Sequence, residues 1–164
     1  MSATVEGVDA RGYLAGWLEA LTGMMVSDIQ AIPDDKWTTG FGGCSKGGNA
    51  LVGDTVTNLR WTTATLKNED SDVYNNMAGV IEETSTKAGA IAALTEASAE
   101  FTAALKAASD EHLNSVKMAP WQMPMPVFIL ANVSVSHVWY HDGQLNYIQT
   151  LLGDDQVHWM APGP

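Results

Sequence analysis

Hydrophobic residues recur at steps of three and four positions over four long stretches of the chain, which is the pattern of amphipathic helices. The first stretch, 8–32, ends at Pro33, because proline cannot continue a helix. The stretch 49–67 has a thinner and more polar stripe, and 88–112 is rich in alanine. The fourth stretch, 127–152, ends at Gly153. The stripe of the first stretch consists of Leu14, Leu18, Leu21, Met25, Ile29 and Ile32.

The segments between these stretches are rich in glycine, proline and polar residues. Residues 36–48 include Trp37 and Phe41, and we expect both aromatic side chains to pack against the end of the bundle. Residues 68–86 hold one short helical piece around 77–81, and the proline-rich segment 118–126 is expected to be a capping loop. The pattern predicts an all-α fold, a four-helix bundle with a long crossover connection. We expect one domain over 1–164, with its core at about 8–153 and a C-terminal tail at 154–164.

The composition is that of a globular protein, with 46% hydrophobic and 16% charged residues among 164. The formal net charge of −11 disfavours nucleic acid and anionic membrane surfaces as partners. The sequence contains neither a long apolar run nor a signal-peptide pattern, so the expected compartment is the cytoplasm. Cys44, the only cysteine, is expected to be an incidental loop residue and not a reactive thiol.

Two histidines, His137 and His141, lie four residues apart in the last helical stretch and therefore share one helix face. Such a pair can direct ring nitrogens at one Zn²⁺, Fe²⁺ or Ni²⁺ ion. The alternative is two partly buried polar side chains with ordinary hydrogen-bond partners. The other histidines, His112 and His158, are expected to be solvated. The face that we expect to point inward contains Ile129, Val133, His137, Tyr140 or His141, Gln144, Ile148 and Leu151.

Three separated segments carry a resemblance to a known family. The segment 136–148, followed by 151–153, has the order His-x3-His-x-Gly-Gln and a terminal glycine. The segment 32–37 has a proline and a tryptophan after the first helix, and 48–54 opens the second helix. In these features the chain resembles the DinB-like (DinB/YfiT-like) family of four-helix-bundle proteins. The resemblance implies a homodimer and a divalent metal, zinc, nickel or iron, held by one histidine of the second helix and two of the fourth.

The chain departs from this pattern in the second helix, because no histidine occurs between Met1 and Glu111. The matching position, three residues after Leu51, is Asp54. In one interpretation Asp54 replaces the missing imidazole, which leaves a set of two histidines and one carboxylate with open positions. In the other, Asp54 pairs with one of the two histidines, holds it protonated, and no metal binds. A shift of one residue would instead place residue 53 or 55 at the site.

Two functions are compatible with this sequence. Some members of the resembled family are thiol-dependent transferases or isomerases, in which the metal lowers the pKa of a low-molecular-weight thiol. This interpretation assigns Asp54, His137 and His141 to the metal, makes Arg60 and Gln144 the residues that bind cofactor or a small-molecule substrate, and assigns no catalytic residue. The alternative is a non-catalytic, metal-free bundle that binds a small molecule or a partner chain. Candidates for the pocket wall, or for simple packing, are Trp61, Trp139 and Tyr140. Asn58, one turn after Asp54, could bind a water or substrate or form a helix-packing hydrogen bond.

Overall fold

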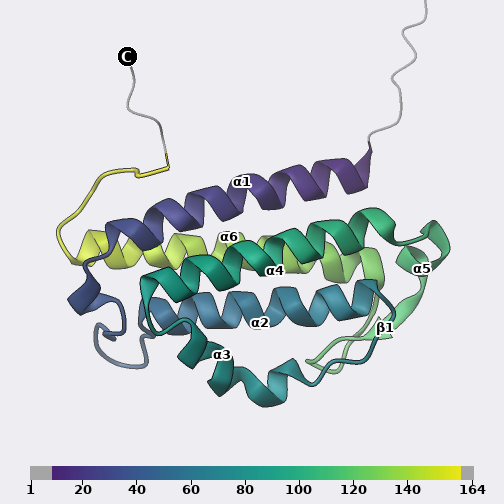
Figure 1. Cartoon of the computed structure of the whole chain (residues 1–164), viewed down its shortest axis with the longest axis horizontal. Coiled ribbons are helices and arrows are strands. Elements are labelled where there is room, and N and C mark those ends of the chain that lie inside the picture. Colours follow the sequence, from purple (N-terminus) through teal and green to yellow (C-terminus); the bar gives the residue numbers. More distant parts are fainter. Residues whose placement is uncertain (1–8, 160–164) are drawn as a thin grey trace, which may run out of the picture.

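Four long helices lie side by side and form the bundle that the hydrophobic pattern predicts (Figure 1). In a computed structural model that describes residues 9–159, they are α1 (Ala10–Ala31), α2 (Gly48–Leu66), α4 (Lys87–Ala107) and α6 (Val127–Leu151). Both α1 and α2 pack against α4 and against α6, so the four helices enclose one hydrophobic core. The prediction of an all-α four-helix bundle is confirmed. Among the described residues, no helix is long and apolar enough to cross a membrane.

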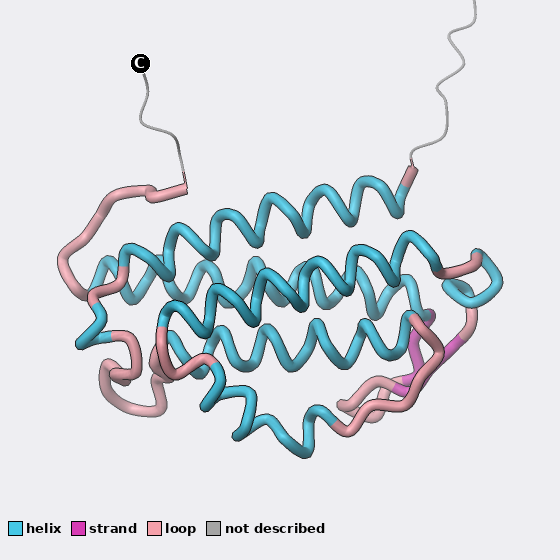
Figure 2. The backbone as a smooth tube through the Cα atoms, in the orientation of Figure 1, coloured by secondary structure: helices cyan, strands magenta, loops and turns pink. Residues whose placement is uncertain are grey.

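Short elements connect the long helices (Figure 2). The 3-10 helix η1 (Asp34–Lys36) follows α1. The crossover from α2 to α4 contains η2 (Val73–Asn76) and α3 (Met77–Glu83), where the sequence predicts one short helical piece. The connection from α4 to α6 contains α5 (Asp110–Asn114) and an antiparallel hairpin of β1 (Val116–Met118) and β2 (Pro124–Pro126).

Two predictions for the connection between α4 and α6 are wrong. The stretch 88–112 is not one helix, because α4 ends at Ala107 and α5 begins after Ser109. The hydroxyl of Ser109 accepts a hydrogen bond of 3.1 Å from the backbone N–H of His112. A serine cap followed by acidic residues is a strong start signal for a helix, and the alanine-rich pattern hid it. The segment 118–126 is not only a loop, because its two ends contribute to the hairpin.

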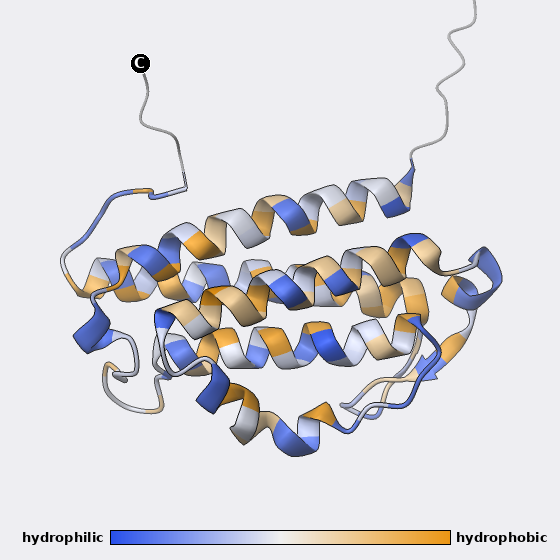
Figure 3. Ribbon diagram, in the orientation of Figure 1, coloured by the Kyte–Doolittle hydropathy of each residue, from blue (hydrophilic) through white to orange (hydrophobic). Residues whose placement is uncertain are grey.

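The inward face of α1 is the one that the sequence predicts. Hydrophilic residues gather in connections such as η1 (Figure 3). The inward face predicted for α6 is partly wrong. Ile129 and Leu151 are 41% and 51% exposed. Of the two alternatives for the position between His137 and Gln144, His141 is the inward residue at 3% exposed, and Tyr140 is 60% exposed. Apolar residues occur on all sides of α6, so the hydrophobic pattern could not define which side meets the core.

Trp37 closes one end of the bundle, as the sequence predicts. Its side chain is 2% exposed, and its indole N–H donates a hydrogen bond of 2.9 Å to the carbonyl of Thr84. Phe41 is partly buried against the same core. The indole ring lies directly over Gly48, the first residue of α2. This packing ties the loop before α2 to the start of that helix.

Replacing Gly48 by alanine is expected to lower the free energy of unfolding by about 1–3 kcal/mol, the usual cost of overpacking a core. A methyl group at this position would overlap the six-membered ring of Trp37. The matched control is Gly16→Ala on the exposed side of α1, where no atom lies within 4 Å of the added methyl group. That variant should gain roughly 0.5–1 kcal/mol, because alanine favours the helix. Denaturant unfolding measures both, and equal effects would contradict the proposed packing of Trp37.

The two remaining histidines have protein partners, so the expectation that both are simply solvated is wrong. Nε2 of His112 lies 2.8 Å from the carbonyl oxygen of Thr65, which ties α5 to the end of α2. Nε2 of His158 lies 2.7 Å from Oδ2 of Asp154 in the segment after α6. Neither histidine contributes to a metal-ligand cluster within residues 9–159.

Candidate metal centre

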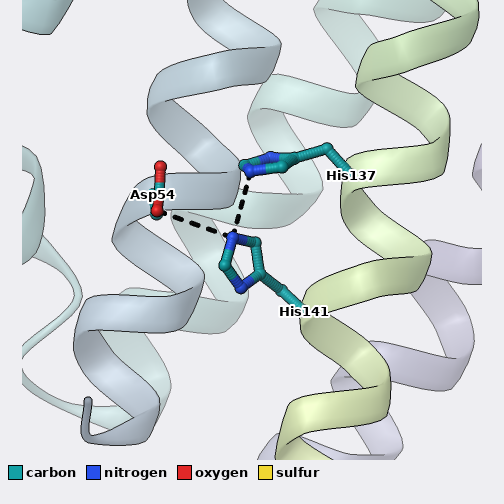
Figure 4. A group of neighbouring side chains, drawn as sticks. All are labelled: Asp54, His137 and His141. Carbon is teal, nitrogen blue, oxygen red and sulfur yellow. Dashed lines mark hydrogen bonds and ion pairs between the residues drawn. The ribbon is translucent and has the colours of Figure 1, made fainter. Parts of the chain in front are cut away.

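Asp54 on α2 and His137 and His141 on α6 bring three potential metal-ligating atoms together between the two helices (Figure 4). Nε2 of His141 lies 3.0 Å from Nε2 of His137 and 3.5 Å from Oδ2 of Asp54. The three ligand atoms all lie within 4.8 Å of one another. The two rings stand one turn apart on the same face of α6, as their spacing predicts.

The structure decides which residue of α2 faces the histidines. The position of Gly53 faces α3, because a side chain there would meet Ile81. The hydroxyl of Thr55 is buried and donates a hydrogen bond of 3.0 Å to the carbonyl of Leu51. Asp54 is therefore the α2 residue of the cluster, and its short carboxylate reaches across the gap between the helices.

The charge states of two of these residues suit metal ligation. The pKa of Asp54 is held well below its ordinary value, first by its pairing with His141 and then by Lys46, against the opposing effect of burial. The pKa of His137 is lowered to about 4, first by burial and then by the neighbouring charge of His141. At neutral pH, Asp54 is thus an anion and His137 is uncharged, the forms in which carboxylate and imidazole bind a metal.

Gln144 orients the ring of His141. Its Oε1 lies 2.7 Å from Nδ1 of His141, while its Nε2 donates a hydrogen bond of 3.2 Å to the hydroxyl of Tyr140. Because the amide nitrogen of Gln144 donates to Tyr140, the amide oxygen of Gln144 is the atom that faces His141. This oxygen accepts a hydrogen bond from Nδ1–H of His141. Nε2 of His141 is then the atom that faces Asp54 and His137, open to either a proton or a metal ion.

Gln144→Ala is expected to weaken zinc binding roughly 10–100-fold, the usual effect of removing a group that orients a ligating imidazole. The exposed Gln30 at the end of α1 provides the matched control Gln30→Ala, which should leave zinc affinity unchanged. Competition with a chromophoric chelator measures the affinity. An affinity of Gln144→Ala equal to that of the control would show that the hydrogen bond to His141 has no orienting role.

A cavity of about 630 Å³ opens beside Asp54, His137 and His141, which form part of its wall. The loop before α2 lines one side with Phe41, Cys44 and Lys46. α6 lines the other side, where Tyr140 and Tyr147 are largely exposed. The ligand cluster is thus accessible to a small molecule from the side of this loop.

The structure does not bring Arg60 to this cavity. Its guanidinium forms two hydrogen bonds, of 2.7 and 2.9 Å, with the carboxylate of Glu83 at the end of α3. The cationic side chain that lines the cavity is Lys46, whose Nζ lies 3.0 Å from Oδ2 of Asp54. Sequence reasoning missed Lys46, because a side chain in a glycine-rich loop has no periodic pattern that fixes its direction.

The other pocket candidates divide between the cavity and plain packing. Tyr140 and Gln144 line the cavity, as does Cys44, which is exposed. Trp139 packs against Trp17 of α1, with ring centroids 5.3 Å apart. Trp61 packs near Tyr74, whose hydroxyl accepts a hydrogen bond of 2.9 Å from the amide of Asn58. The three candidates Trp139, Trp61 and Asn58 are not among the residues that line the cavity.

No family model and no curated protein matches the sequence. Among solved structures, the chain is similar to mycothiol-dependent maleylpyruvate isomerase, with a TM-score of 0.64 at 9% sequence identity, over 82% of this chain and 60% of that one. A histidine-to-alanine mutant of that enzyme gives a TM-score of 0.63 at 10% identity, with the same coverage. What is shared is the fold. The chain spans about 60% of the length of that isomerase.

Proposed function

We propose that the chain is a DinB-like protein that binds a divalent metal through Asp54, His137 and His141 and uses it in a thiol-dependent transfer or isomerisation. The observation that carries this proposal is the convergence of three ligand atoms at the wall of an open cavity. The similar solved enzyme is mycothiol-dependent, which supports the choice of a low-molecular-weight thiol as co-substrate.

Two of the three separations within the cluster suit a shared ion, and the third is at most 4.8 Å. Two ligands bound at 2.0–2.1 Å to one tetrahedral ion lie about 3.3 Å apart. The separations of Nε2 of His141 from its two neighbours, 3.0 and 3.5 Å, are close to that value. Two imidazoles and one carboxylate suit Zn²⁺ or Fe²⁺ and leave coordination positions open. The residues present therefore fit the metal that the resemblance implies.

The chain's own residues have distinct roles in this proposal. Bound at this site, a divalent ion would lower the pKa of a thiol, so that the thiolate is available at neutral pH. His137 remains neutral as a ligand because burial lowers its pKa to about 4. Gln144 holds the ring of His141 in place, and Tyr140 and Tyr147 form the exposed wall along which a substrate can lie.

The metal-free module remains the second candidate, and one observation favours it. With a proton on Nε2, His141 can donate to Nε2 of His137 at 3.0 Å and pair with Asp54 at 3.5 Å, while its Nδ1 bonds Gln144, so the cluster closes without an ion. Lys46 completes the charge balance at Asp54. A proton and a metal ion therefore compete for the same nitrogen of His141.

Titration of the cobalt-loaded protein with a low-molecular-weight thiol tests the proposed function. We expect a sulfur-to-cobalt charge-transfer absorption in the wild-type chain and in His158→Ala, whose histidine lies outside the cavity. The same titration of His137→Ala should give no such absorption. Spectra of the cobalt-loaded wild type that do not change with thiol would overturn the thiol-dependent function.

A further inference from the structure

Lys46 is held at the mouth of the cavity by a single ion pair. Its Nζ lies 3.0 Å from Oδ2 of Asp54, the same oxygen that lies 3.5 Å from Nε2 of His141. The lysine side chain is 50% exposed, whereas the carboxylate of Asp54 is 20% exposed. Lys46 is therefore the mobile partner of this pair, and Asp54 is the fixed one.

The backbone around Lys46 is defined by its own contacts. The hydroxyl of Ser45 accepts a hydrogen bond of 2.6 Å from the N–H of Phe41, and the N–H of Ser45 donates one of 3.1 Å to the carbonyl of Gly42. Gly42 and Gly43 have φ values of 100° and 56°, which favour glycine. The loop thus holds the base of Lys46 while its long side chain can turn between alternative partners.

A divalent ion and the ammonium group of Lys46 compete for Asp54. An ion held by Asp54 and the two histidines would withdraw charge from Oδ2 and repel an ammonium group placed within hydrogen-bond distance of that oxygen. Metal binding therefore frees the lysine from Asp54. The chain carries a net charge of −11, so most of its surface repels anions. A released ammonium group at the cavity would instead attract them.

The cavity offers the freed ammonium a particular kind of ligand. Among its lining residues, Lys46 is the one lysine or arginine, and Asp54 is the one carboxylate. Phe41, Leu51 and Ile148 supply an apolar surface in the same cavity. A small molecule with a carboxylate at one end and an apolar or aromatic body would satisfy both features.

On this basis, and resting on the proposed metal function, we infer that Lys46 is a metal-released receptor for the carboxylate of the substrate. In the metal-free chain it neutralises Asp54, and in the metal-loaded chain it binds the anionic end of a small carboxylic acid. Lys46 is available to the carboxylate only after the metal has displaced it from Asp54. The metal therefore binds before the substrate.

Zinc affinity tests the first half of this inference. Lys46→Met removes the competitor of the metal, so zinc should bind roughly three- to tenfold more tightly than to the wild type, the scale of a partly exposed ion pair. Lys106→Met on the exposed side of α4 makes the same change in net charge far from the cavity and should leave affinity unchanged. Equal zinc affinities in Lys46→Met and Lys106→Met would overturn the inference alone. Failure of the wild-type chain to bind zinc would overturn the proposed function, and the inference with it.

Binding of benzoate to the zinc-loaded proteins tests the second half. We expect benzoate affinity to fall about tenfold in Lys46→Met, the scale of one charge-assisted hydrogen bond, and to stay unchanged in Lys106→Met. Benzyl alcohol, which has the same ring and no charge, should bind Lys46→Met and the wild type alike. A benzoate affinity that does not depend on Lys46 would overturn its role as a carboxylate receptor.

Discussion

Asp54→Ala is expected to weaken zinc binding at least about a hundredfold, because even groups that only orient a ligand contribute 10–100-fold. The variant removes one of three ligand atoms that lie within 4.8 Å of one another. It also removes the anion that offsets the charge of the ion beside the imidazoles of His137 and His141. His137→Ala should have an effect of similar size, and chelator competition measures both.

The control for this prediction is His158→Ala, which removes an imidazole from outside the cavity and should bind zinc like the wild type. The metal-free alternative predicts a different result. In that case Asp54→Ala would change stability, because it unpairs Lys46 and His141, while zinc affinity would be equally weak in all variants. Zinc binding by Asp54→Ala within tenfold of the wild type would show that the carboxylate is not a ligand.

Asp142→Asn is expected to stabilise the metal-free protein by roughly 2–4 kcal/mol at pH 7, because the folded chain holds a proton that the unfolded chain releases. Asp142 is 4% exposed, and burial together with the neighbouring Asp28 raises its pKa to about 8. Asp28 already receives hydrogen bonds from the amides of Asn146 and Gln149, whereas Oδ1 of Asp142 has no partner among the described side chains. Of the two neighbouring carboxyl groups, Asp142 is therefore the one that holds the proton. The N–H of an asparagine amide at position 142 can replace the O–H of this carboxyl as a donor.

The sign of the pH dependence follows from the direction of this shift. The pKa of Asp142 is higher in the folded chain than its ordinary value of 3.8, so its carboxyl favours folding at low pH and loses that effect as pH rises toward 8. His137 acts in the opposite sense, because its lowered pKa destabilises the fold as pH falls from 6.5 toward 4. Between about pH 4 and 6.5, the contributions of Asp142 and His137 to the pH dependence of the free energy of unfolding nearly cancel. Above that range, only the contribution of Asp142 remains.

Urea unfolding of the chelated protein at several pH values measures this prediction. The stability advantage of Asp142→Asn over the wild type should grow as pH rises from about 4 toward 8. Asp155→Asn, in the exposed segment after α6, is the control and should show no such trend. If Asp142→Asn is less stable than the wild type at pH 7, the buried carboxyl is not held in its neutral form.

The parts of the site that the sequence predicts are those fixed by local geometry. The spacing of His137 and His141 places both rings on one face of the helix, and in the structure their Nε2 atoms lie 3.0 Å apart. Trp37 was recognisable as a buried aromatic residue in a loop of small residues. The resembled pattern predicts Asp54 by its position in the second helix. The contacts of Gly53 and Thr55 exclude these two neighbours of Asp54 from the candidate metal site.

The parts that the sequence did not predict depend on how distant segments meet. The inward face of α6 could not be fixed because apolar residues surround that helix. Arg60 lies six residues beyond Asp54 and pairs with Glu83, a partner in another element that no local pattern specifies. The buried pair of Asp28 and Asp142 joins α1 to α6 across most of the chain. Each of these contacts is set by helix packing and not by neighbours in sequence.

Elemental analysis of the untagged wild-type chain, purified without chelator and again after reconstitution with zinc, tests the central claim most directly. A site built from Asp54, His137 and His141 predicts about one divalent ion per chain, removed by chelator and restored by added metal. A chain that stays free of metal after reconstitution, with its fold intact, would contradict the claim and leave a hydrogen-bonded cluster closed by protons and Lys46.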